Sequence, residues 1–180
     1  MLKGLSLFAL LLIQSCAVGS THQIPTSTQR MATLTRVRQS ETTLILSKTN
    51  RSNILGNPIW ALTTPSGQSF DVVTGRSFTQ SKNRHQEGTE APLPPGTYYI
   101  GKTHHGPFSL EELGNSWFID LIPQFNTGRT ELGIHLDPSF GISENEDGTS
   151  GCIGMTNPQD LNELVHLIET RGINKLVVSS

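Results

Sequence analysis

Short apolar runs separated by turn residues recur along the chain from residue 42 onward. Runs rich in β-branched and apolar residues, bounded by glycine, proline or asparagine, predict strands. We expect strands at 42–46, 59–63, 70–73, 97–100, 117–122, 132–136 and 175–178, with 152–155 a short strand or a turn. Residues 50–57 carry turn residues, and Pro65-Ser66-Gly67 predicts a hairpin turn. Residues 76–91 are polar and aperiodic, which indicates a long loop.

Only one segment has a clear helical period. Asn157 is a suitable side-chain cap, Pro158 suits the first helical position, and Gly172 supplies a stop. The apolar residues between them recur at the i, i+3, i+4, i+7 spacing of a buried face, namely Leu161, Leu164, Val165 and Ile168. The pattern therefore predicts a mostly β domain with one packed C-terminal helix.

The N-terminal segment predicts export rather than folding. Lys3 precedes an apolar run that is too short to span a bilayer, as in a secretory signal. Leu12-Ile13-Gln14-Ser15-Cys16 resembles a bacterial lipobox, although Gln14 is not the usual small residue. We expect a signal peptide at 1–15 and acylation of Cys16. An ordinary cleaved signal, with Cys16 incidental, is the alternative.

Composition places the rest of the chain in one soluble domain. Residues 16–41 are rich in Ser, Thr and Gln without apolar periodicity and predict a flexible tether, followed by a domain at 42–180. The net charge is −2 with no basic run, so we expect no nucleic-acid partner. We expect a monomer that touches a membrane only through a lipid at Cys16.

Cys152 is the candidate nucleophile of this domain. It lies in the glycine-rich stretch Gly148–Met155 (GTSGCIGM), with His135 upstream in Gly133-Ile134-His135. A cysteine is mostly a thiol at neutral pH and needs a neighbouring base to become a nucleophile, and His135 is the best-placed base. The alternative is an inert, packed cysteine.

These segments, together with Pro92–Ile100 (PLPPGTYYI), resemble the L,D-transpeptidase (YkuD) catalytic domain. The resemblance covers residues 42–179 and implies a β-sandwich-like fold with one packed helix. It implies cysteine-dependent acyl transfer on peptidoglycan stem peptides, either transpeptidation or carboxypeptidase trimming. Cys152 would be the nucleophile, His135 the base and the amides near Gly151 and Cys152 the oxyanion donors. Thr149 would hold the imidazole through its carbonyl or its hydroxyl.

Two positions depart from the pattern of that family. Ser150 stands where the family commonly has histidine, and Gly154 where it commonly has arginine. We expect Arg129, or next Arg84, to replace that arginine and to bind substrate together with Ser150. The alternative for both arginines is a solvated surface position.

The resemblance implies no cofactor, and the residues predict no metal. His104 and His105 are adjacent, so on a strand they would point to opposite faces. We expect a protein of the cell envelope, lipid-anchored and facing the periplasm, or secreted if Cys16 is not acylated. A non-catalytic lipoprotein that binds peptidoglycan is the alternative function, and an effector secreted against a competitor's wall is a third.

Overall fold

The computed structural model describes residues 31, 41–109, 113, 115–142 and 146–179. The predicted signal peptide at 1–15, the acylation site at Cys16 and nearly all of the tether lie outside these described residues. Within the described part of the chain, no helix is both long and apolar enough to cross a membrane.

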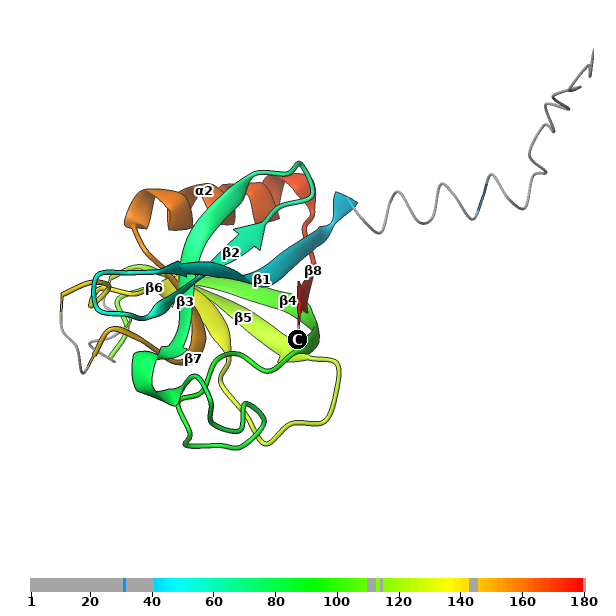
Figure 1. Cartoon of the computed structure of the whole chain (residues 1–180). Coiled ribbons are helices and arrows are strands. Elements are labelled where there is room, and N and C mark those ends of the chain that lie inside the picture. The colour runs from blue at the N-terminus through cyan, green and yellow to red at the C-terminus, as the bar shows by residue number, and fades with distance from the viewer. Residues whose placement is uncertain (1–30, 32–40, 110–112, 114, 143–145, 180) are drawn as a thin grey trace, which may run out of the picture.

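The sheet of the domain closes on itself as a barrel (Figure 1). Its strands follow one another around the barrel in the order β1-β2-β3-β7-β6-β5-β4-β8. β1 pairs in parallel with β8, β6 pairs in parallel with β7, and every other neighbouring pair is antiparallel. The elements are β1 (Thr43–Ser52), β2 (Pro58–Thr63), β3 (Ser69–Arg76), the 3-10 helix η1 (Ser77–Thr79), β4 (Gly96–His105), β5 (Trp117–Pro123), β6 (Gly133–Leu136), β7 (Gly148–Met155), α2 (Pro158–Arg171) and β8 (Lys175–Val178).

The core fills the inside of the barrel with alternate residues of each strand, as the period of two requires. In β1, for example, Leu44 and Leu46 are fully buried while Ile45 between them is exposed. Trp60 and Tyr98 are buried in this core, and Trp117 is partly buried and packs against it.

Helix α2 packs on the barrel and lies at the top of the view in Figure 1, opposite the long β3–β4 loop. Its predicted capping is confirmed. The Asn157 side chain accepts a hydrogen bond from Asp160 N at 2.9 Å, and Gly172 ends the helix with a φ of 64°. The helix buries five apolar side chains, from Leu161, Leu164, Val165, Leu167 and Ile168.

The mostly β fold with one packed helix is confirmed, and several strands exceed their predicted lengths. β1 runs to Ser52, into the predicted turn, because its pairing with β2 resumes beyond an irregularity between Lys48 and Ser52. β7 begins at Gly148 rather than Cys152, because Gly148 pairs with Arg76 of β3. In both places cross-strand pairing overrides local turn chemistry.

Candidate active site

The parallel pairing of β6 with β7 places Cys152 and His135 on one face of the barrel wall. Ile134 pairs with Ile153, and both are fully buried in the core. His135 follows Ile134 in the strand, so its side chain points away from the interior of the barrel, to the face that Gly154 shares. Cys152 lies two residues before Gly154 on the same face and is half-buried. The thiol and the imidazole are therefore diagonal neighbours on adjacent strands.

The imidazole of His135 is held in a defined tautomer. Its Nδ1 lies 2.7 Å from Leu136 O, and a carbonyl oxygen only accepts, so Nδ1 carries a proton. In the neutral ring, Nε2 is then the unprotonated nitrogen. Phe118 stacks on the ring at a centroid distance of 5.9 Å and an interplanar angle of 15°. His135 is only 2% exposed, and the hydrogen bond and the ring contact together fix the orientation of its imidazole.

Gly133 explains how Phe118 reaches this position. A Cβ on Gly133 would lie 2.2 Å from Phe118 Cζ, so the aromatic ring covers the strand where the glycine has no side chain. Sequence reasoning missed Phe118. A glycine inside the predicted strand, two residues before His135, was the signal of a close approach.

The Thr149 hydroxyl organises the backbone around Cys152. It donates to Cys152 O at 2.6 Å and accepts from Gly151 N at 3.2 Å and from Gly75 N at 3.4 Å. We expected the carbonyl or the hydroxyl of Thr149 to hold the imidazole. The hydroxyl proton goes to the Cys152 carbonyl, and a role for the Thr149 carbonyl stays a prediction. The Gly151 amide, expected as an oxyanion donor, is bonded to the Thr149 hydroxyl. The Cys152 thiol itself donates to Glu131 O at 3.7 Å.

Arg129 lies directly against Ser150–Cys152, the stretch of β7 around the positive φ of Gly151 that we call the Cys152 turn. Its side chain is 7% exposed, and Nη2 donates to Ser150 O. Nη1 donates to Ala91 O at 3.4 Å and to Arg84 O at 3.5 Å. A Cβ on Gly151, whose φ is +117°, would overlap Arg129 Nη2 at 1.7 Å. Arg129 is therefore a buried residue of the site, and the reading of a solvated surface arginine is wrong for it.

Arg84 is also partly buried, but its side-chain contacts are with Leu93 and with Trp60 of β2 rather than with the residues around Cys152. Its Nε donates to Leu93 O at 2.9 Å, Nη2 donates to the same oxygen, and the guanidinium lies 5.3 Å from the ring centroid of Trp60. Burial lowers the pKa of this guanidinium. Through these contacts the Arg84 side chain holds the long β3–β4 loop against the barrel. Its role in substrate binding stays a prediction.

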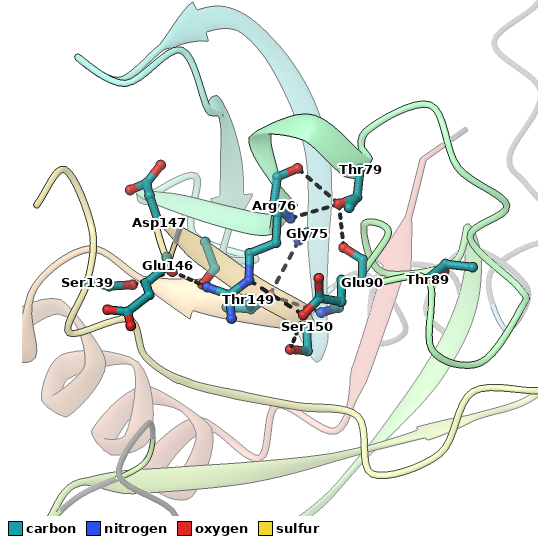
Figure 2. A network of polar contacts seen from close by, with 12 residues as sticks. Gly75, Arg76, Thr79, Thr89, Glu90, Ser139, Glu146, Asp147, Thr149 and Ser150 are labelled. Atoms are coloured by element: carbon teal, nitrogen blue, oxygen red, sulfur yellow. Dashed lines mark hydrogen bonds and ion pairs between the residues drawn. The ribbon is translucent and has the colours of Figure 1, made fainter. Parts of the chain in front are cut away.

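Ser150 faces solvent beside a network of polar contacts (Figure 2). Its hydroxyl donates to Glu90 Oε1 at 3.4 Å, and the same oxygen lies 3.9 Å from Arg76 Nε. Arg76 Nη1 in turn donates to Gly148 O at 2.9 Å and to Glu146 O. The network connects the β3–β4 loop to the start of β7 and leaves Ser150, two residues before Cys152, exposed.

Gly154 has no room for the arginine that is common in the family. A Cβ at this position would lie 2.8 Å from Thr149 Cγ2, 2.9 Å from Asp137 Cβ and 3.1 Å from Val73 Cγ2. A guanidinium cannot enter from β7, whereas Arg129 reaches the site from the β5–β6 connection.

Two buried carboxylates, which sequence reasoning did not identify, tie down the chain before β7. Asp137 accepts from Gly148 N at 2.9 Å and from the Ser139 hydroxyl at 2.6 Å. Burial raises its pKa, against these hydrogen bonds, and the nearby Asp147 adds to the rise. Asp147 accepts from Asn53 Nδ2 at 2.8 Å and from Gly141 N at 2.7 Å. Among the described residues, no cluster of His, Cys, Asp or Glu has the arrangement to hold a metal ion.

Comparison with known proteins identifies the family. Residues 42–178 match the family described as YkuD, the L,D-transpeptidase catalytic domain. No curated protein and no solved structure matches the chain. The matched segment runs from the start of the barrel to its last strand and contains both Cys152 and His135. By this match the chain belongs to the L,D-transpeptidase catalytic domain family, with the L,D-transpeptidase-type function on peptidoglycan that membership carries.

Proposed function

We propose that this chain is a cysteine-dependent acyl transferase of peptidoglycan stem peptides, with Cys152 as nucleophile and His135 as general base. The observation that carries the proposal is the shared outer face of β6 and β7. It puts a half-buried thiol diagonally across from an imidazole whose Nδ1 proton is fixed on Leu136 O. The remaining nitrogen, Nε2, is then the acceptor for the thiol proton.

The reaction follows from this arrangement. Nε2 of His135 takes the thiol proton, and Cys152 Sγ attacks the carbonyl carbon of the L-centre of a diamino acid. The C–N bond to the terminal D-residue breaks, and the imidazolium returns a proton to the leaving amine. The resulting thioester passes to an amine of a second stem, which makes a cross-link, or to water, which trims the stem.

Oxyanion stabilisation is assigned to the Cys152 side of the turn. The Gly151 amide already donates to Thr149 Oγ1, so it is not the donor that we assign to the oxyanion. The Cys152 amide therefore remains the predicted donor. One oxyanion-hole donor is typically worth about 2.7–4 kcal/mol in the transition state.

The exposed Ser150 is the residue that we assign to substrate contact beside the nucleophile. Outside the described residues, acylation of Cys16 would hold the enzyme at the membrane, facing the periplasm. The predicted tether of about 25 residues has a root-mean-square reach of roughly 25–30 Å as a flexible coil. That reach suits an enzyme that works on a wall close to its membrane.

Intact-mass spectrometry of the full chain, incubated with tetrapeptide-bearing muropeptides, tests the proposal. We expect a covalent adduct that maps to Cys152 and disappears in Cys152→Ala. His135→Ala should form the adduct at least a hundredfold more slowly, which is the low end for general base catalysis. His166→Ala, the loss of an exposed histidine on α2, is the matched control and should react like the wild type.

The released products then separate cross-linking from trimming. Binding of muropeptides with neither adduct nor product would contradict the enzyme and favour the alternative, a non-catalytic lipoprotein that binds peptidoglycan. Full activity of a Cys152→Ser protein would remove Cys152 from the mechanism.

A further inference from the structure

The positive charge of Arg129 has no carboxylate partner in the described part of the chain. No Asp or Glu oxygen of those residues lies within 4.0 Å of its guanidinium, and the side chain is 7% exposed. Its guanidinium donates to the main-chain carbonyls of Arg84, Ala91 and Ser150. Burying a charge is costly unless hydrogen bonds satisfy it. Here the three carbonyl oxygens supply those hydrogen bonds to the buried guanidinium.

The contact with Ser150 O begins a continuous chain of hydrogen bonds that ends at the nucleophile. Arg129 Nη2 donates to Ser150 O, which belongs to the same peptide unit as Gly151 N. Gly151 N donates to Thr149 Oγ1 at 3.2 Å, and Thr149 Oγ1 donates to Cys152 O at 2.6 Å. Each bond polarises the next in such a chain, and the first donor here is a cation.

The chain fixes both sides of Cys152. It holds the peptide unit before Gly151 and the carbonyl of Cys152 itself, so the nucleophile stands on a turn that is bonded at both ends. The positive φ of Gly151 and the missing Cβ let the guanidinium come this close. Any other residue at 151 would displace the cation or bend the turn.

We propose that Arg129 is a positioning residue, which holds the Cys152 turn through this hydrogen-bond chain and does not bind the substrate carboxylate. The inference rests on the proposed function of Cys152 as nucleophile. It replaces the expectation that Arg129 binds substrate, because the hydrogen bonds to three main-chain carbonyls direct the guanidinium into the protein rather than towards an incoming stem.

Two assays on the full chain test this role. The first measures kcat and KM on tetrapeptide muropeptides, and the second measures the rate of Cys152 alkylation by iodoacetamide, which has no carboxylate. For Arg129→Gln we expect kcat to fall on the order of 100-fold, the typical effect of a small misplacement of a reacting group. KM should change less than about threefold, and alkylation should slow as well. Arg51→Gln, which removes an exposed cation paired with Asp71, is the control and should change neither rate.

The opposite pattern overturns the proposal. A raised KM with normal kcat and normal alkylation would make Arg129 a substrate-binding residue, and no change in any value would leave it no role. If the wild type alkylates at Cys152 but turns over no muropeptide, the proposed function fails, while the alkylation rates still decide the role of Arg129.

A second pair of variants covers the case in which Arg129→Gln does not fold. Thr149→Val breaks the same chain at its other end, whereas Thr149→Ser keeps the hydroxyl. Alkylation should be at least tenfold faster in Thr149→Ser than in Thr149→Val. Equal rates in these two variants would show that the chain does not position the thiol.

Discussion

Replacing Gly151 by alanine puts a methyl group where the guanidinium of Arg129 lies. The added Cβ would be 1.7 Å from Nη2 and 2.7 Å from Cζ of Arg129, and 3.0 Å from Ala91 O. Two of these contacts are shorter than any real Cβ contact. Because Ala91 O belongs to the backbone, the structure can relax only by moving the guanidinium out or by distorting the turn that carries Cys152.

Two contributions set the size of the effect. A side chain at a φ of +117° carries strain of about 1–3 kcal/mol. Displacing the guanidinium from Ser150 O loses a charged hydrogen bond, worth about 1.5–3 kcal/mol. The expected loss of unfolding free energy is therefore about 2.5–6 kcal/mol. That is a large share of the total of about 5–15 kcal/mol that a natural domain has.

Urea unfolding followed by tryptophan fluorescence measures this loss, because Trp60 and Trp117 both contact the barrel core. The matched control is Gly67→Ala. Gly67 also has a positive φ, +88°, but nothing lies within 4 Å of its added Cβ, so it reports backbone strain alone. We expect Gly151→Ala to cost more than Gly67→Ala by the value of the lost guanidinium contact.

A double-mutant cycle decides whether Arg129 is the cause. In an Arg129→Ala background only the 3.0 Å approach to Ala91 O remains, so the cost of Gly151→Ala should fall by the value of the lost guanidinium contact. Strictly additive costs of the two substitutions would refute the steric argument.

Three further predictions concern the base, the helix and the loop before β7. Gly133→Ala drives a Cβ to 2.2 Å from Phe118 Cζ, so the ring must leave the imidazole; we expect kcat to fall at least tenfold, and an unchanged kcat would contradict the stacking role. Asn157→Ala removes the cap of α2 and should cost about 1 kcal/mol in urea unfolding, with Asn157→Ser restoring most of it. Burial raises the pKa of Asp137, so its stabilising contribution is present at acid pH and is lost as pH rises through the folded-state pKa. The free energy of unfolding of the wild type, relative to that of Asp137→Asn, should therefore rise as pH is lowered from neutral towards the ordinary Asp pKa of about 4. A relative stability that falls over this range would contradict the raised pKa.

Local patterns predicted the elements because each carries its own signal. Asn157 and Gly172 bound the helix as cap and stop, and the period-two burial of β1 follows its apolar residues. The closure of the sheet was not predictable in this way. It depends on β8 lying between β1 and β4, and no residue of Lys175–Val178 encodes which strands it meets.

In the candidate site too, the residue types were predictable from the sequence, whereas the contacts that depend on the tertiary fold were not. Cys152 and His135 were predicted from their residue types and glycine neighbours. The contact of Arg129 with Ser150 O was not, because it depends on how the β5–β6 connection folds against β7. The hydrogen bond from the Thr149 hydroxyl to Cys152 O was not predicted either, because it depends on the backbone geometry around Gly151.

Strand β8 closes the barrel, because it pairs with β1 on one side and with β4 on the other. It is the last strand among the residues that the structure describes. Until residues 175–178 have been synthesised, the preceding strands form at most an open sheet whose β1 and β4 edges are unpaired. Contacts between the two ends of a chain form slowly, because the entropy of closing a long loop must be met first. The order of the strands thus delays completion of the barrel until β8 is available, and it makes this four-residue strand decisive for a domain whose candidate site lies elsewhere.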